Sequence, residues 1–185
     1  MQSLYATVFG HIMRIITLLF LVTLSLCSFG QTSNPFINLK FDKVVIYDYE
    51  QNGENPALVD KGQILKDVKI KKQIQLGKAT IDKLNTKLGD KKSYGNNHAD
   101  CFEPHLGIVF YFQNKTVADV LVCLDCNRLS SSIDIPAIKQ GRQGKGKETY
   151  YALDGLSKSF RHFLNDMLKK YNFSHQIKAG SMFDK

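Results

Sequence analysis

Hydrophobic and polar positions follow the period of β-strands in three parts of the chain. Residues 43–49 form a β-branched and aromatic run that predicts a strand, and a turn cluster at residues 51–56 ends it. Residues 64–76 alternate less regularly and indicate a second extended segment. Apolar runs at residues 106–112 and 117–122 are separated by a short polar stretch, which is the pattern of a β-hairpin.

The period changes to that of a helix in two places. Residues 78–88 carry apolar side chains at three- and four-residue spacing and precede Gly89, a candidate C-terminal cap. The segment from Ser157, a candidate N-cap, to Tyr171 is amphipathic and predicts a helix that covers a sheet face. Between the hairpin and this helix, residues 127–150 are predicted to form mostly a flexible loop.

Strands and helices do not alternate regularly, and the hairpin lies between the two helices. This order favours an α+β fold in which two helices pack on a mainly antiparallel sheet of about four strands. Arg161 and Asn165 are predicted to lie on the polar side of the second helix. His162 and His175 have no acid or thiol at a telling spacing, so both are expected to face solvent, and residues 172–185 are predicted to be a tail.

The N-terminal segment has the organisation of a secretory signal peptide. A short basic region begins at Met13, residues 15–26 are largely apolar, and small residues precede a cleavage site at Gly30-Gln31. The apolar run is too short to span a bilayer, which takes about 20 residues. We therefore expect Met13 to be the true start, residues 1–30 to be removed, and residues 31–185 to form a single periplasmic or secreted domain.

Charge narrows the choice of partners. The chain has a formal net charge of +8, and removal of the N-terminal segment takes away one arginine and no other charged residue. The lysines are spread along the chain without interleaved aromatic residues, which argues against nucleic acid as a partner. We expect a solvated basic surface, an unidentified partner in the cell envelope, and no transmembrane segment in the exported chain.

The hairpin carries the main chemical lead, because cysteines flank its open end. A turn centred on Asn114-Lys115 would bring Cys101 close to Cys126, with His105 near both. Thiols tend to pair in an oxidising compartment, yet the exported chain has three. One thiol must therefore stay free, bind a metal or pair with another molecule.

A disulfide is the simplest use of these thiols. The bond would join Cys123 to Cys126, or Cys101 to one of them, and the hairpin register favours Cys101–Cys126. Closing that loop is worth roughly 3.5 kcal/mol by the chain-entropy relation. The remaining thiol would be buried and inert.

A metal site is the second alternative. Cys101, His105, Cys123 and Cys126 supply the four nitrogen and sulfur ligands of a tetrahedral structural zinc site, and two of them have the Cys-x2-Cys spacing of such sites. Zinc is the one cofactor that this pattern suggests.

Thiol–disulfide exchange is the third alternative. In thioredoxin-like proteins Cys-x2-Cys opens a helix whose N-terminus stabilises the thiolate, but here the following residues are a poor helix start. Arg128 would favour a thiolate, whereas Asp125 between the cysteines opposes it. The loop that leads into the first cysteine supplies further candidate site residues, namely Tyr94, His98 and Asp100.

A longer motif surrounds the cysteines. Ser93-Tyr94-Gly95 precedes Cys-Phe-x-Pro at residues 101–104, a Gly-hydrophobic-hydrophobic-Phe-Tyr strand follows at residues 107–111, and Cys-x2-Cys-Asn ends it. Over about residues 94–129 this pattern resembles a family of small exported proteins of Gram-negative bacteria. The resemblance implies export but no particular activity. His105 stands where that family has either Arg or His, and Arg is not a metal ligand.

No hydrolase pattern is present in the sequence: Gly-x-Ser-x-Gly, paired carboxylates and His-Glu-x-x-His are all absent. The sequence therefore predicts an exported, non-catalytic interaction or structural module with a disulfide-stapled hairpin. A metal-binding or thiol-redox protein is the alternative.

Overall fold

The computed structural model describes residues 34–51, 56–139, 142–143, 145–148, 150–151, 154–177 and 180–184. Ser33–Lys185 form one compact unit. The predicted signal peptide lies outside the described residues, as do parts of the loop predicted at residues 127–150. None of the helices in the described ranges combines the length and hydrophobicity needed to cross a membrane.

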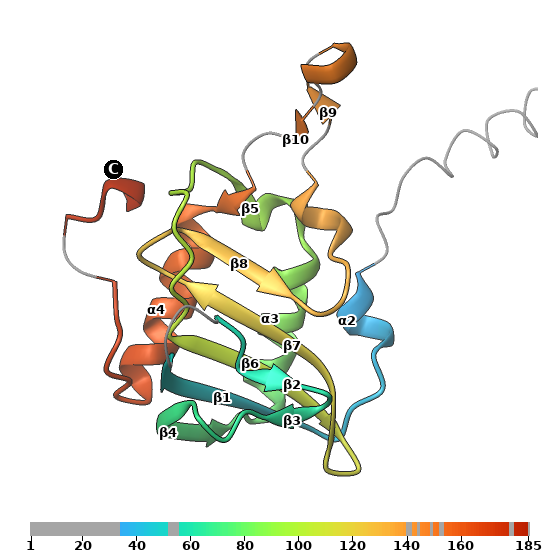
Figure 1. Ribbon diagram of the computed structural model, residues 1–185, viewed down its shortest axis with the longest axis vertical. Helices are drawn as coiled ribbons and strands as arrows, with labels where there is room; N and C mark the ends of the chain where they lie inside the picture. Colours follow the sequence, from blue (N-terminus) through green and yellow to red (C-terminus); the bar gives the residue numbers. More distant parts are fainter. Residues whose placement is uncertain are drawn as a thin grey trace, which may run out of the picture. The chain divides into compact units, whose positions relative to one another are not determined.

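A five-stranded antiparallel sheet forms the centre of the fold (Figure 1). Its strand order is β4-β1-β6-β7-β8, and the strands are β1 (Lys43–Glu50), β4 (Lys69–Gln75), β6 (Leu106–Phe112), β7 (Lys115–Cys123) and β8 (Arg128–Ser131). The predicted α+β class with a mainly antiparallel sheet is therefore confirmed, with one strand more than expected. That strand, β8, falls in a segment predicted as loop, and it forms because the chain turns back after β7 and pairs with it.

The β6–β7 hairpin turns one residue earlier than predicted. Gln113 and Asn114 both have positive φ, 50° and 63°, as a tight two-residue hairpin turn requires. The turn is therefore centred on Gln113-Asn114 instead of Asn114-Lys115, and Phe112 pairs with Lys115. A register shift between Phe110 and Tyr111 then moves the rest of the ladder, so the open end differs from a regular hairpin.

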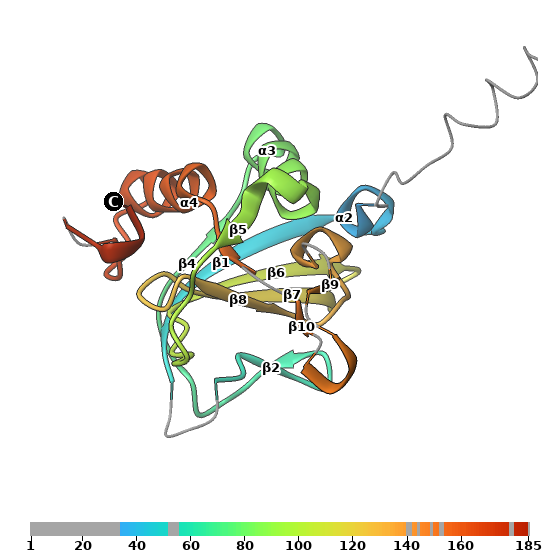
Figure 2. The ribbon, with the colours of Figure 1, turned by 90° about the horizontal axis from the view of Figure 1, so that it is seen from above.

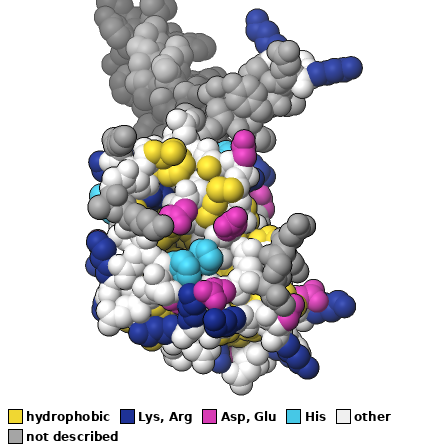
Figure 3. Space-filling view, turned by 60° about the vertical axis from the view of Figure 1, so that its left-hand side comes forward, with side chains coloured by type: hydrophobic (Ala, Val, Ile, Leu, Met, Phe, Trp, Pro, Cys, Tyr) yellow, Lys and Arg dark blue, Asp and Glu magenta, His cyan; other side chains and the backbone are white. Residues whose placement is uncertain are grey.

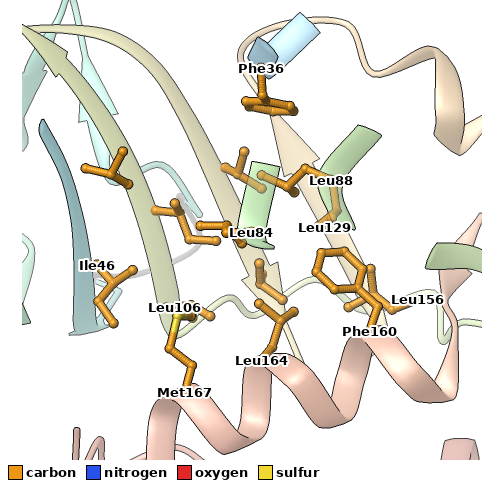
Figure 4. Packing of buried hydrophobic residues seen from close by; sticks show 14 of the residues in the cluster. Phe36, Ile46, Leu84, Leu88, Leu106, Leu129, Leu156, Phe160, Leu164 and Met167 are labelled. Atoms are coloured by element: carbon orange, nitrogen blue, oxygen red, sulfur yellow. The ribbon is translucent and has the colours of Figure 1, made fainter. Parts of the chain in front are cut away.

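Helices cover one face of the sheet. Figure 2 shows α3 (Lys78–Gly89) and α4 (Lys158–Lys170) on the side of the sheet opposite to β2. Ser157 caps α4 as predicted, because its side chain accepts a hydrogen bond from the Phe160 backbone N–H. Apolar side chains of α4 point toward the strands in Figure 4, where Phe160, Leu164 and Met167 form a row. The short helix α2 (Pro35–Asn38) adds Phe36 to the same core.

Gly89 is the last residue of α3 and not the C-terminal cap that was predicted. It lies within the helix, and the C-cap is Asp90. A Cβ on Gly89 would lie 1.9 Å from the side chain of Asn34, so the glycine permits a close approach of α2 and α3.

The opposite face of the sheet has a smaller core. The hairpin of β2 (Val59–Asp60) and β3 (Gln63–Ile64) packs here, and Leu58, just before it, is fully buried. Gly107 in β6 admits this packing, since a Cβ there would lie 2.1 Å from the Leu58 side chain.

The remaining elements are short. They are β5 (Tyr94–Asn96), which pairs with β11 (Gly155–Leu156), β9 (Arg142–Gln143), which pairs with β10 (Tyr150–Tyr151), and the 3-10 turns Lys91–Ser93, Pro136–Ile138, Gly146–Glu148 and Met182–Asp184.

Two predictions about the C-terminal part are wrong. Arg161 and Asn165 are buried, at 1% and 7% exposure, because the chain after α4 folds back over that side of the helix. The predicted tail supplies this cover. The Ile177 N–H donates to the Asn165 side chain, and Ser181 and Asp184 contact Arg161.

Candidate functional site

Three sulfur atoms lie together at the open end of the β6–β7 hairpin, and we call Cys101, Cys123 and Cys126 the cysteine cluster. Cys123 and Cys126 form a disulfide, and the free, exposed Cys101 has its Sγ 2.8 Å from the Cys126 Sγ. The cluster was predicted, but the favoured bond, Cys101–Cys126, is not the one formed. The chain turns back directly after β7, and this turn brings the Cα atoms of Cys123 and Cys126 to 5.2 Å, which suits a disulfide.

Two hydrogen bonds hold the loop of Cys101 against this turn. The Ala99 N–H donates to the Cys126 carbonyl at 2.9 Å, and the Asn127 side-chain amide donates to the Asn97 carbonyl at 2.7 Å. Asn127 has a positive φ of 55°, a conformation that asparagine tolerates better than most residues. Hydrogen bonds that join the residues just before Cys101 to Cys126 and Asn127 thus place Cys101 beside Cys126.

The buried side chain of Arg161 in α4 holds the turn between the bonded cysteines through hydrogen bonds. Its Nη1 donates to the Leu124 carbonyl and, at 3.1 Å, to the Asn127 Oδ1. Its Nε donates to the Asp184 Oδ1 at 3.0 Å, and this contact lowers the pKa of the Asp184 carboxyl. The guanidinium therefore links the disulfide turn to the C-terminal segment.

A second cluster consists of Asp48, His105, Ser174 and His175, and we call it the histidine cluster. The rings of His105 and His175 stack with centroids 3.7 Å apart and planes at 4°. The His105 Nδ1 lies 3.2 Å from the Tyr49 carbonyl oxygen, which only accepts, so Nδ1 carries the proton in this contact. Figure 3 shows histidine side chains next to each other, with acidic side chains above and below them.

Asp48 anchors the C-terminal part of this cluster. Its side chain is 2% exposed and accepts hydrogen bonds from the Ser174 backbone N–H and, at 3.0 Å, from the Ser174 hydroxyl. The His175 Nδ1 lies 3.2 Å from the Asp48 Oδ1. Sequence reasoning missed this cluster; the available signal was an aspartate inside an otherwise apolar strand, because a buried carboxylate needs partners.

A pocket of about 100 Å³ is lined by His105, Ser174 and His175 of the histidine cluster and by residues of the turn between the bonded cysteines. Its apolar part comes from β6, β7, α4 and the turn between the bonded cysteines, and its polar part from His105, this turn and the C-terminal segment. The lining residues are His105, Leu106, Val122, Leu124, Asp125, Leu168, Ser174, His175 and Gln176. Leu124 and Asp125 stand between the two bonded cysteines, so the disulfide shapes one wall of the pocket.

The structure does not assemble the four predicted zinc ligands. Cys123 and Cys126 are bonded to each other, and His105 is held by Tyr49 and stacked on His175. No group of three or more His, Cys, Asp or Glu side chains in the described ranges is arranged to hold a metal ion.

The side chains of Tyr94 and His98 contact other parts of the fold and do not line the pocket. Tyr94 is buried, donates its hydroxyl to the Leu88 carbonyl at 2.8 Å and packs edge-on against Phe160. Burial raises the pKa of this phenol above its ordinary value. The His98 Nε2 lies 2.8 Å from the Asp154 Oδ1, so this imidazole ties the loop to the segment before β11.

The other predicted polar residues, Asp125, Arg128 and Asp100, lie in three different places. Asp125 is exposed and lines the pocket, whereas Arg128 begins β8 opposite Cys123. Asp100 is exposed beside Cys101.

Comparisons with models of known protein families, with curated proteins and with solved structures found no match. The chemistry of the two clusters and of the pocket is therefore the basis for the function.

Proposed function

We propose that this chain is an exported, non-catalytic interaction module of the cell envelope that receives a small apolar group of a partner protein in the pocket. The observation that carries the proposal is the composition of that pocket. Leu106, Val122, Leu124 and Leu168 offer apolar contact, and histidine, aspartate, serine and glutamine side chains surround them. An apolar floor with a few polar groups is typical of a binding site.

The size of the pocket selects the kind of occupant. Its volume is about 100 Å³, whereas sites for drug-sized ligands take roughly 300–1,000 Å³. A single apolar side chain of a partner fits this scale better than a whole metabolite. Residues at the centre of protein interfaces commonly anchor in small, well-packed pockets of this kind.

Rigidity of the pocket wall supports the same role. The disulfide and the buried Arg161 hold both ends of the short turn that carries Leu124 and Asp125. A wall held in place before binding loses less conformational entropy when the partner docks. Export is supported by the sequence of the N-terminal segment and by the resemblance to small exported proteins.

A direct test uses N-acetyl-leucinamide as a probe, followed by amide chemical shifts of the protein. We expect saturable shifts at Leu106, Val122 and Leu124 as the apolar side chain enters the pocket. N-acetyl-glycinamide is the matched probe without a side chain and should leave these signals unchanged. The hollow over β1, β4 and β6 that includes Tyr47 and Gln73 is an internal control region. Equal shifts with both probes, or shifts spread over the whole protein, would contradict the proposal.

The contribution of the Cys123–Cys126 disulfide to stability is tested by replacing both cysteines, Cys123→Ser together with Cys126→Ser. Closing so short a loop is worth about 2 kcal/mol by the chain-entropy relation, so the free energy of unfolding should fall by about that amount. Urea unfolding of the oxidised proteins measures it. An unchanged midpoint would show that the disulfide does not support the pocket wall.

A further inference from the structure

The free thiol of Cys101 has no role in the proposed binding module, yet it touches the disulfide. We propose that the cysteine cluster is a thiol–disulfide exchange centre in which exposed Cys101 connects the buried Cys123–Cys126 bond to the dithiol of a partner protein. This activity goes beyond binding in the pocket and does not depend on it.

Access is the first argument. Cys123 and Cys126 are each 1% exposed, so a folded partner cannot bring a thiol to either sulfur. Cys101 is exposed, and its Sγ lies 2.8 Å from the Cys126 Sγ. Cys101 is thus the one member of the cluster that meets both solvent and the disulfide.

Preorganisation is the second argument. The hydrogen bonds from Ala99 to Cys126 and from Asn127 to Asn97 fix the loop and the turn to each other. They hold the thiol against one particular sulfur of the disulfide, as exchange through a defined mixed disulfide requires.

The leaving group is the third argument. The Cys126 backbone N–H donates to the Cys123 Sγ at 3.1 Å. A hydrogen bond to sulfur favours the thiolate, and a better-stabilised thiolate leaves faster in exchange. Attack on Cys126 therefore expels the sulfur that already has a donor in place.

The first step is internal and changes no oxidation state. The Cys101 thiolate attacks the Cys126 Sγ, the Cys123–Cys126 bond breaks, and Cys123 leaves as a thiolate that takes a proton from water. The product is a Cys101–Cys126 disulfide with one sulfur at the surface.

The next steps transfer two electrons from the partner. A partner thiolate attacks the Cys101 Sγ, and Cys126 leaves as a thiolate. The second partner thiol, after losing its proton, then attacks the partner sulfur of this mixed disulfide and releases Cys101. The partner ends with a disulfide and this chain ends with three reduced cysteines; a partner disulfide drives the same steps in reverse.

The test compares the wild-type chain with Cys101→Ser, each expressed with its own N-terminal segment and recovered oxidised from an oxidising compartment. The probe is reduced thioredoxin, a folded dithiol protein too bulky to reach a buried sulfur. We expect its reaction with Cys101→Ser to be slower by about tenfold or more, because the exposed thiol is missing. Thr86→Ser, a neutral substitution at an exposed position of α3, is the matched control and should react like wild type.

Equal rates for Cys101→Ser and wild type would overturn the proposal. Because Cys101 takes no part in the observed disulfide, its replacement should leave the unfolding midpoint unchanged, which checks the fold. A second variant tests whether the sulfurs of Cys101 and Cys126 can form a bond, without a measurement of the exchange rate. Cys123→Ser retains only the attacking and attacked sulfurs, and peptide mapping should find a Cys101–Cys126 disulfide. Two free thiols in that variant under oxidising conditions would also overturn the proposal.

Discussion

The turn between the bonded cysteines and the histidine cluster both supply lining residues of the pocket, but they are built in different ways. The cysteines lie 3 and 25 positions apart, and a covalent bond joins two of them. Asp48 and His175 are 127 positions apart and meet only through hydrogen bonds between a central strand and the C-terminal segment. One wall of the pocket is thus held by a disulfide between residues close in sequence. The other wall depends on the docking of a segment that is distant in sequence.

This difference predicts different behaviour of the two walls. A disulfide turn keeps its shape as long as the bond is intact, whereas a docked segment can open locally without global unfolding. The histidine side is therefore the part of the pocket that can adapt to a partner. The cysteine side responds to redox chemistry instead.

The largest expected effect comes from removing the group that supports the cysteine side. Arg161→Met keeps most of the side-chain length but leaves Asp184 without its cation and two acceptors in the turn without their donor. Leaving two buried acceptors and a partly buried carboxylate without their donor costs about 3 kcal/mol in total. We expect a loss of that size in the free energy of unfolding, measured in urea with the disulfide intact.

Lys169→Met is the matched control, because Lys169 lies on the exposed side of the same helix. Its effect should stay within about 0.5 kcal/mol, as for most surface substitutions. Similar losses for both variants would mean that the buried guanidinium network does not specifically support the turn.

Asp48→Asn removes contacts that anchor the C-terminal segment in the histidine cluster. The amide keeps the shape of the carboxylate but replaces one acceptor oxygen with a donor that faces the Ser174 N–H, the Ser174 hydroxyl or His175. Loss of a buried, charge-assisted hydrogen bond costs about 2 kcal/mol. Hydrogen exchange should show faster exchange of the Ser174 amide, while the amide of Cys126 stays protected.

An equal increase of exchange at Ser174 and Cys126 would contradict the comparison, because it would mean that the two walls open together. An exchange rate at Ser174 unchanged from wild type would show that Asp48 does not anchor the C-terminal segment.

The sequence allowed prediction of what is local and periodic. The first strand, the hairpin and both long helices follow from hydrophobic period, and Ser157 marks the start of α4. The meeting of Cys101 with Cys126 was also accessible, because both flank one hairpin. The bond itself was not, since the shift in the β6–β7 ladder and the tight turn into β8 leave no periodic signal.

The histidine cluster and Arg161 could not be found in this way for a different reason. A charged residue on an amphipathic helix is exposed unless another segment covers it, and here the cover comes from a segment with no hydrophobic period. His175 looked isolated because its partner, Asp48, belongs to the first strand. Contacts of this range depend on the final packing and not on local pattern.

The smallest effect concerns pH and the salt bridge between Arg161 and Asp184. The hydrogen bond from Arg161 lowers the pKa of Asp184 in the folded state below its unfolded value of about 3.9. The ionised carboxylate therefore stabilises the fold fully above about pH 4, and this contribution is lost as pH falls through the folded pKa.

Asp184→Asn isolates this contribution. Its free energy of unfolding should lie below that of wild type by about 1 kcal/mol at neutral pH, because the pair is charge-assisted but partly exposed. Urea unfolding at a series of pH values should show this difference constant down to about pH 5 and shrinking below about pH 4. A difference that persists unchanged at pH 2 would mean that Asp184 acts through packing and not through its charge. The C-terminal segment would then be held at Arg161 by shape alone, and acid would not release it from the disulfide turn.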